Sequence, residues 1–88
     1  MNIQIKKFGR LLISRPSGKE AFATALAYIF PKEAHEITLD FEGVNVLAPS
    51  WADEFITGIK NQYKDIKINF INTSNESVEA TLKLLASI

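Results

Sequence analysis

The sequence predicts a small two-layer α/β domain with the element order β-β-α-β-α-β-α. Short segments with alternating apolar residues, typical of half-buried strands, are followed by longer segments whose apolar residues recur at helical spacing. The chain has 88 residues, of which 47% are hydrophobic and 23% charged, so we expect a single domain over residues 1–88. The outward positions of the expected strands are mainly polar, which predicts a mixed four-stranded sheet with helices mainly on one face.

The first two strands are expected at residues 3–5, which read IQI, and at residues 10–14, which read RLLIS. Only a short gap at residues 7–9 separates them, and this favours an antiparallel hairpin over a crossover connection. Arg15 precedes a proline, so it should stay extended and end the second strand.

The first helix should begin at Ser17, which forms a capping box with Glu20. In such a box the serine hydroxyl accepts a free backbone N–H, and the glutamate side chain reaches back to the start of the helix. Pro31 should end the helix. The apolar residues behind the box predict one inward face, formed by Phe22, Leu26, Ile29 and Phe30.

A third strand is expected at residues 35–41, which read HEITLDF and alternate between apolar and polar side chains. Glu42 and Gly43 form a turn, and residues 44–47 are a short extended link. A second helix should begin at Pro49 and Ser50, with an inward face made of Ala52, Phe55, Ile56 and Ile59.

The last strand is expected at residues 65–72, which read DIKINFIN. The final helix has two candidate caps, because Thr73 forms a capping box with Glu76 while Asn75 is also a preferred N-cap residue. Its inward face should carry Val78, Leu82 and Leu85.

The composition argues against several classes of function. Lys plus Arg equals Asp plus Glu, with ten of each, so there is no electrostatic case for nucleic acid or an anionic membrane. The chain has no cysteine and one histidine, His35, so we expect no metal site, no cofactor and no enzymatic nucleophile–base pair. The first residues lack the charged start and apolar core of a signal peptide, so we expect a cytoplasmic protein.

Residues 39–59, LDFEGVNVLAPSWADEFITGI, carry a resemblance to a known family together with this element order. The chain resembles the STAS domains of sulfate transporters and anti-sigma factor antagonists. It is most similar to a compact bacterial and phage STAS-like group whose function is not established. Features shared with that group are Ser14-Arg15 at the end of the second strand, the LDFEGV strand, and the helix opening Ser50-Trp51-Ala52-Asp53-Glu54.

The resemblance places Ser50 at the position of the serine that is phosphorylated in anti-sigma factor antagonists. The kinase there has a histidine-kinase-like ATPase fold. The neighbouring residues depart from the Asp-Ser-Ser-Gly pattern of those proteins, because Ala48, Pro49 and Trp51 replace the acid, the first serine and the glycine. The alternative is that Ser50 is the N-cap of the second helix, with Asp53 at the third helical position completing a capping-box variant.

Trp51 also has two interpretations. Tryptophan is enriched at interface hot spots, so it could anchor a partner protein. Its spacing to Phe55 equally suits an aromatic residue at the edge of the core. The sequence leaves both open and favours the core.

The leading functional hypothesis is a non-enzymatic regulatory module that binds another protein. The resemblance implies that the partner is a histidine-kinase-like ATPase or an anti-sigma-like factor, and that it contacts the turn and helix that start at Ser50. A homo-oligomer is compatible with the sequence. The residues expected at the interface are Pro49, Ser50, Trp51, Asp53 and Glu54.

The alternative hypothesis is a domain that binds a small ligand or nucleotide. Open α/β sheets bind ligands in the crevice outside the carboxyl ends of their strands. The polar residues that the predicted topology could gather there are Ser14, Arg15, Asp40, Ser50 and Asn72.

Overall fold

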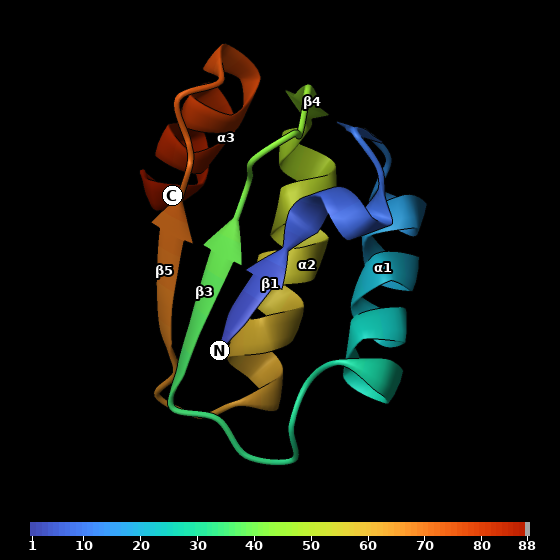
Figure 1. The fold of residues 1–88 in the computed structure, drawn as a ribbon, viewed down its shortest axis with the longest axis vertical. Helices are drawn as coiled ribbons and strands as arrows, with labels where there is room; N and C mark the ends of the chain where they lie inside the picture. Colours follow the sequence, from blue (N-terminus) through green and yellow to red (C-terminus); the bar gives the residue numbers. More distant parts are fainter. Residues whose placement is uncertain (88) are drawn as a thin grey trace.

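The computed structural model describes residues 1–87 and shows an α/β fold with three α-helices, one short 3-10 helix and five short strands (Figure 1). The strands form two separate sheets, a three-stranded sheet in the order β1-β3-β5 and a two-stranded sheet of β2 and β4, and every pair is parallel. The α/β class is confirmed, and the single mixed four-stranded sheet is wrong. The elements in chain order are β1 (Asn2–Gln4), η1 (Ile5–Phe8), β2 (Leu11–Leu12), α1 (Arg15–Tyr28), β3 (Glu36–Asp40), β4 (Val46–Leu47), α2 (Pro49–Gln62), β5 (Lys67–Ile71) and α3 (Glu76–Ala86).

The predicted hairpin between the first two strands does not form. β1 pairs with β3, with Ile3 opposite Leu39, whereas β2 pairs with β4, with Leu11 opposite Val46. The reason is the 3-10 helix η1 between the two strands, followed by Gly9 at a φ of 123° that favours glycine. This segment carries the chain out of the first sheet. The link predicted at residues 44–47 accordingly contains a strand.

The start of α1 also differs from the prediction. The helix begins at Arg15, and the hydroxyl oxygen of Ser14 accepts the backbone N–H of Ser17 at 3.1 Å, so the N-cap is Ser14. Arg15 is therefore helical and not extended. Pro16 is tolerated because the N–H groups of the first helical turn have no intrahelical partner.

The inward face of α1 is built from small residues. Gly18, Ala21 and Ala25 are buried, whereas Leu26 is 38% exposed. An added Cβ on Gly18 would lie 2.6 Å from the carbonyl oxygen of Trp51, which shows how closely the backbones of α1 and α2 approach. The larger residues of the predicted face lie beside this contact, and only Phe30 among them is buried.

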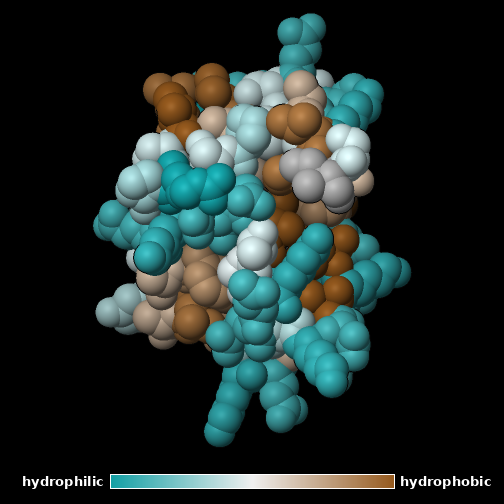
Figure 2. Space-filling view, turned by 180° about the vertical axis from the view of Figure 1, so that it is seen from behind, coloured by the Kyte–Doolittle hydropathy of each residue, from teal (hydrophilic) through white to brown (hydrophobic). Residues whose placement is uncertain are grey.

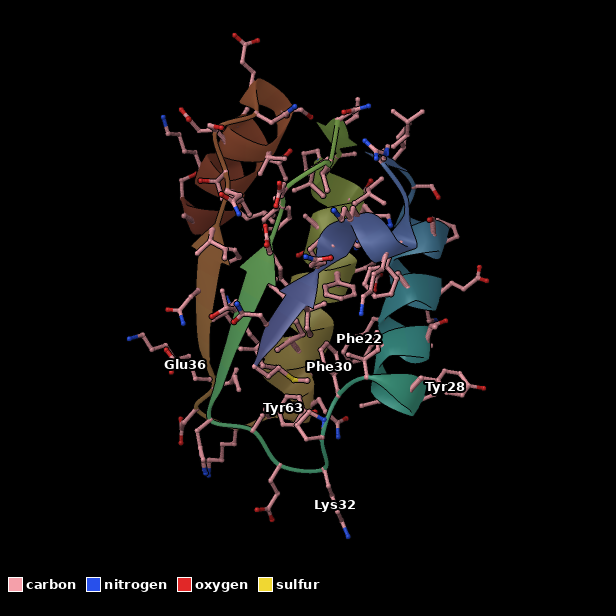
Figure 3. The ribbon with its side chains drawn as sticks, viewed as in Figure 1. Phe22, Tyr28, Phe30, Lys32, Glu36 and Tyr63 are labelled. Atoms are coloured by element: carbon pink, nitrogen blue, oxygen red, sulfur yellow. The ribbon has the colours of Figure 1, made fainter. Side chains whose placement is uncertain are left out.

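In Figure 1, α2 lies behind the three-stranded sheet, α1 lies to the right of it and packs against α2, and α3 lies beside β4 and α2. An aromatic cluster joins α1 and the segment after it to α2, because Phe22 and Phe30 both pack against Phe55. In Figure 3, Phe22, Phe30 and Tyr63 lie together near the lower end of α2, whereas Tyr28 points away from the molecule. The Tyr63 hydroxyl donates a hydrogen bond to the carbonyl of Pro31.

The C-terminal part of the chain follows the predictions more closely. β5 falls inside the predicted range, and the side chain of Asn75 accepts the N–H of Val78 at 3.1 Å, so Asn75 and not Thr73 caps α3. Val78 and Thr81 are the fully buried side chains of this helix. Among residues 1–87, no helix is both long enough and apolar enough to cross a bilayer.

Candidate functional site

The starts of α1 and α2 meet through an ion-pair cluster. The guanidinium Nη1 of Arg15 lies 3.0 Å from the Asp53 carboxylate and 3.2 Å from the Glu54 carboxylate. All three side chains remain partly exposed to solvent. The fold thus brings three predicted site residues together from positions almost forty residues apart in the chain.

Hydrogen bonding sets the charge state of this cluster. The bond from Arg15, followed by one from the Thr57 hydroxyl, lowers the pKa of Asp53. The bonds to Asp53 and Glu54 raise the pKa of Arg15. Both pKa shifts favour the charged forms of Arg15 and Asp53, so this pair stays ionised at neutral pH.

Ser50 is not the N-cap of α2. The helix begins one residue earlier, at Pro49, and the N-cap residue is Ala48, which has no side-chain oxygen to cap it. Proline suits this first position because its fixed φ is already helical and it lacks the N–H that would be left unpaired. The Ser50 hydroxyl instead donates a hydrogen bond of 3.0 Å to the carbonyl of Ile13, so it ties α2 to the end of β2.

Trp51 belongs to the core and cannot anchor a partner. It is 1% exposed, its ring stacks on Phe55 with a centroid distance of 5.1 Å, and Phe8 lies 6.2 Å away. Its indole Nε1 is buried without a hydrogen-bond partner among residues 1–87. Of the two interpretations that the sequence allowed, the core position is confirmed, and Trp51 leaves the candidate interface.

A hollow of about 460 Å³ lies between the start of α2 and the last turn of α3. Leu84, at its margin, is 50% exposed, and the cationic and anionic side chains of the cluster lie on the opposite side. The residues lining the hollow are Arg15, Pro49, Ser50, Asp53, Leu84 and Leu85.

A second, narrower hollow of about 150 Å³ shares Leu85 with the first and continues along the α2–α3 contact toward β5. It is lined mainly by apolar side chains: Ile56, Lys60, Phe70, Leu82, Leu85 and Ala86. The two hollows together form a partly apolar surface beside Ser50. Figure 2 shows hydrophobic surface of this kind between hydrophilic side chains on the face seen from behind.

The sequence reasoning missed the contribution of α3 to this site. Leu84 and Leu85 are neighbours on a helix, and neighbouring positions lie about 100° apart, so both cannot face the same core. This adjacency was a signal in the sequence that one of them faces solvent.

Asp40 and Asn72 form a separate pair at the carboxyl ends of β3 and β5. The Asn72 side-chain amide donates to the Asp40 carboxylate at 2.9 Å, and the backbone N–H of Glu42 donates to the same oxygen. These two bonds, and more weakly the charge of Lys6, lower the pKa of Asp40. Asn72 adopts a left-handed φ of 55°, a conformation that asparagine tolerates better than most residues.

The five residues of the ligand-binding alternative therefore fall into two groups. Arg15 and Ser50 line the α2–α3 hollow and Ser14 caps α1 close by, whereas Asp40 and Asn72 bond each other elsewhere and line none of that hollow. Both groups have their polar atoms engaged in structural hydrogen bonds. No observation within residues 1–87 gathers the five into one crevice.

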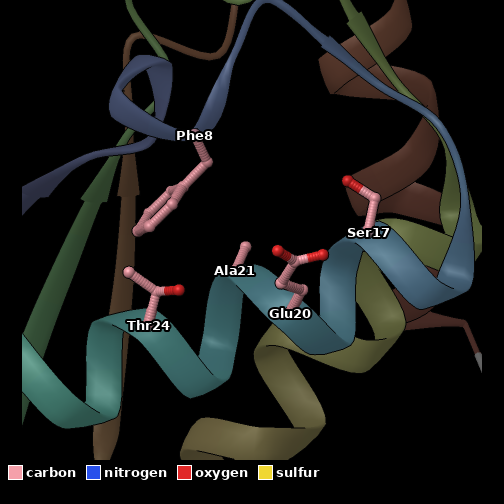
Figure 4. A pocket seen from close by; sticks show the side chains of 5 residues that line it. All are labelled: Phe8, Ser17, Glu20, Ala21 and Thr24. Carbon is pink, nitrogen blue, oxygen red and sulfur yellow. The ribbon is translucent and has the colours of Figure 1, made fainter.

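Another hollow, of about 250 Å³, lies between η1 and α1 and contains no predicted site residue (Figure 4). Glu20 and the hydroxyls of Ser17 and Thr24 line it on α1, and Phe8 covers it from η1. Within the described part of the chain no three acidic, histidine or cysteine side chains gather as metal ligands would.

Two parallel sheets and three α-helices, with the strand–turn–helix around Ser50, define the class of this protein as a small α/β domain. Residues 20–78 match the family model of the STAS-like domain of unknown function (DUF4325), so the chain belongs to that family and the predicted resemblance is confirmed. The match includes Ser50 but neither Arg15 nor Leu84. No curated protein and no solved structure matches the chain.

Proposed function

We propose that this domain is a non-enzymatic regulatory module that binds a partner protein through the first turn of α2 and the hollow beside it. The observation that carries the proposal is the half-exposed Leu84 across a hollow of about 460 Å³ from the Arg15–Asp53 ion pair. An apolar centre with a charged rim is the usual anatomy of a protein-binding surface.

The two sides of the hollow would serve different purposes. Pro49, Leu84 and Leu85 offer apolar surface that a partner side chain can fill, and such filled pockets dominate binding energy. Arg15, Asp53 and Glu54 lie at the rim, where charged groups set orientation and association rate more than affinity.

Membership of a STAS-like family supports the class of partner, which we take to be a histidine-kinase-like ATPase or an anti-sigma-like factor. Ser50 would be the site of regulation by phosphorylation. A phosphate there would add about −1.5 to −2 charges. It would lie at the start of a helix, where the free N–H groups favour an anion, and in a hollow whose cation is Arg15.

A phosphate on Ser50 would also change the present arrangement. The modified oxygen could no longer donate to the Ile13 carbonyl, and Arg15 would have to leave the carboxylates of Asp53 and Glu54 to pair with it. The proposal therefore implies a local rearrangement at the junction of β2, α1 and α2.

Site-specific photo-cross-linking in the native host tests the location of the interface. A benzophenone side chain would be placed at Leu84 and, as a control, at Tyr28, which is 86% exposed on the far end of α1 (Figure 3). We expect one defined protein adduct from position 84, identified by mass spectrometry, and none from position 28. Equal adducts at both positions, or no adduct at 84, would place the interface elsewhere.

Substitutions then test the chemistry of the captured contact. Leu84→Glu should abolish the adduct formed by a benzophenone placed at Pro49, whereas Tyr28→Glu should leave it unchanged. Ser50→Asp should weaken the contact more than Ser50→Ala, because only aspartate adds charge. Trp51→Ala is unsuitable, since removing a buried tryptophan costs about 3–5 kcal/mol and would test folding instead.

A further inference from the structure

The first two turns of α1 carry polar side chains that the fold leaves without a structural role. The sequence predicts a capping box of Ser17 and Glu20, but the observed cap is Ser14, so neither side chain caps the helix. Thr24 lies on the same side of the helix, because residues three and four positions apart are neighbours on a helix surface. Among residues 1–87 the side chains of Ser17, Glu20 and Thr24 have no hydrogen-bond or ion-pair partner.

The hollow of about 250 Å³ between η1 and α1 brings these groups opposite an aromatic ring. In Figure 4 the ring of Phe8 points toward α1, while the Glu20 carboxylate and the Ser17 hydroxyl point into the space between the two helices. The ring is also packed from behind, with its centroid 5.3 Å from that of Phe55 and 6.2 Å from that of Trp51. Phe8 is therefore a fixed wall of the hollow.

The chemistry of the lining selects a cation. Glu20 is the one charged residue that lines this hollow. Its carboxylate accepts hydrogen bonds, the hydroxyls of Ser17 and Thr24 can accept them, and the face of an aromatic ring attracts positive charge. An anion would meet the carboxylate with no cation in the lining to offset it. A positively charged hydrogen-bond donor would satisfy every polar group at once.

The cations of the chain that lie nearest do not fill the hollow. Lys7 and Lys19 are chain neighbours of lining residues, but neither lines the hollow, and neither pairs with Glu20 within residues 1–87. Consecutive helical positions lie about 100° apart, so Lys19 projects from a different side of α1. Arg15 is held on the α2 side by Asp53. The Glu20 carboxylate is therefore open to a cation from outside the chain.

Among organic cations, a guanidinium group matches this arrangement best. It is planar, stacks on aromatic faces and binds a carboxylate through two parallel hydrogen bonds. Its five N–H donors suffice for the Glu20 carboxylate and for both hydroxyls. An ammonium group is compact and strongly hydrated, so it gains less from a ring such as that of Phe8.

We propose that the hollow between η1 and α1 binds a guanidinium group between the Phe8 ring and the Glu20 carboxylate. The hydroxyls of Ser17 and Thr24 accept its remaining N–H groups. The group belongs either to an arginine of a partner polypeptide or to a free small molecule, and the two sources share this chemistry. The inference does not depend on the proposed function, because this hollow shares no lining residue with the α2–α3 hollow.

The test is an NMR titration of the intact, ¹⁵N-labelled chain with N-acetyl-arginine amide at low salt. N-acetyl-citrulline amide is the neutral probe of the same shape, and N-acetyl-lysine amide is the ammonium probe. Glu20→Gln removes the charge and Phe8→Leu removes the aromatic face. The control is Glu33→Gln, which removes an exposed acid that lines a different hollow beyond the end of α1. A dispersed spectrum would show that each variant is folded.

We expect the arginine probe to shift the amides of Phe8 and Glu20 with a Kd in the millimolar range, the lysine probe to bind more weakly, and the citrulline probe to leave them unchanged. Glu20→Gln should weaken binding about fivefold, Phe8→Leu about threefold and Glu33→Gln not at all. The proposal is overturned if citrulline binds as arginine does, if Glu20→Gln binds as tightly as the wild type, or if the shifts are confined to Asp53 and Glu54. No shift with the arginine probe would also overturn it.

Two further probes distinguish the source of the group. Agmatine is a free guanidinium compound, and a five-residue peptide with one arginine between glycines presents the same group on a backbone. Tighter binding of the peptide, lost in Glu20→Gln, would assign the hollow to an arginine of a polypeptide. Tighter binding of agmatine, lost in the same variant, would assign it to a small molecule.

Discussion

The close approach of the α1 and α2 backbones gives a sharp stability prediction for Gly18→Ala. The new methyl group would lie 2.6 Å from the carbonyl oxygen of Trp51 and 2.9 Å from its Cα. Ordinary contact would require α1 and α2 to separate by about 0.8 Å, because both obstacles are backbone atoms. Overpacking of this kind costs about 1–3 kcal/mol, and we take the upper end. Alanine recovers about 1 kcal/mol of helix propensity, so the expected net loss is about 2 kcal/mol.

Urea unfolding followed by the fluorescence of the single tryptophan measures this loss. With an m-value of about 1 kcal/mol/M, the midpoint should fall by about 2 M. Gly58→Ala is the matched comparison, because its added methyl meets the side chain of Phe22 at 2.8 Å rather than backbone atoms. The whole ring of Phe22 would have to shift, but a partly buried side chain moves more easily than a helix backbone, so we expect Gly58→Ala to lose less stability than Gly18→Ala. A Gly18→Ala variant as stable as the wild type, or less affected than Gly58→Ala, would refute the reasoning about the helix contact.

Three further predictions concern polar groups. Thr81→Val removes one of two hydroxyls that bond the carbonyl of Leu47, leaving the longer bond of 3.3 Å from Ser77, and should cost about 0.5–1.5 kcal/mol in urea unfolding. Thr24→Val on the exposed side of α1 should cost almost nothing. The hydrogen bond from Arg15 is the main cause of the lowered pKa of Asp53, so the Asp53 carboxylate stabilises the fold fully above its unfolded pKa of about 3.9, and this stabilisation is lost as the pH falls through the lower folded pKa. Asp53→Asn should therefore lose less stability on acidification than the wild type, and an equal loss would contradict this. Burial raises the pKa of Tyr63, so the neutral Tyr63 hydroxyl stabilises the fold fully below its unfolded pKa of about 10, and this stabilisation is lost as the pH rises through the folded pKa. Tyr63→Phe should be less stable than the wild type by about 0.5–1.5 kcal/mol at neutral pH and should lack this alkaline loss. Urea unfolding at neutral and at alkaline pH measures both effects.

The elements with strong periodicity could be predicted from the sequence. The strand expected at residues 35–41 is found at Glu36–Asp40, and the strand expected at 65–72 is found at Lys67–Ile71. Asn75 was one of two candidate caps and is the cap observed. These elements depend on local patterns, in which alternation fixes a strand and a short polar side chain fixes a helix start.

Strand pairing could not be predicted in the same way. The short gap at residues 7–9 suggested a hairpin, but Ile5 is fully buried within a 3-10 helix and the glycine that follows turns the chain away. The alternation of three residues is too short to distinguish a strand from the start of such a helix. Because the first strand then pairs with β3, the whole sheet becomes parallel.

The face of α1 was predicted only in part, because Phe22, Ile29 and Phe30 pack in or against the core, whereas Leu26 is exposed. Hydrophobicity selects large residues, so the pattern pointed to the side of Leu26. The packed face instead carries Gly18, Ala21 and Ala25, because small side chains let the backbone of α1 approach α2 closely. How closely two helix backbones approach depends on both helices, so the sequence of one helix does not determine it.

The site was predictable in its residues but not in its contacts. Ser50, Pro49, Asp53 and Arg15 were all candidates from sequence, yet Arg15 was assigned to a different hypothesis from the acids it contacts. Leu84 was not considered at all. Ion pairs and hollows between elements distant in the chain depend on the relative placement of helices, which local patterns do not encode.

The hydrogen bond of Ser50 connects the α2–α3 hollow to β2. Its hydroxyl lines the hollow and at the same time holds the carbonyl of Ile13, the residue that follows β2. A phosphate on Ser50 would therefore change the charge of the hollow and release the end of β2. A cap would have coupled Ser50 only to its own helix. The observed bond couples it to β2 instead, so a modification at this one position would be felt both in the hollow and at the end of the strand.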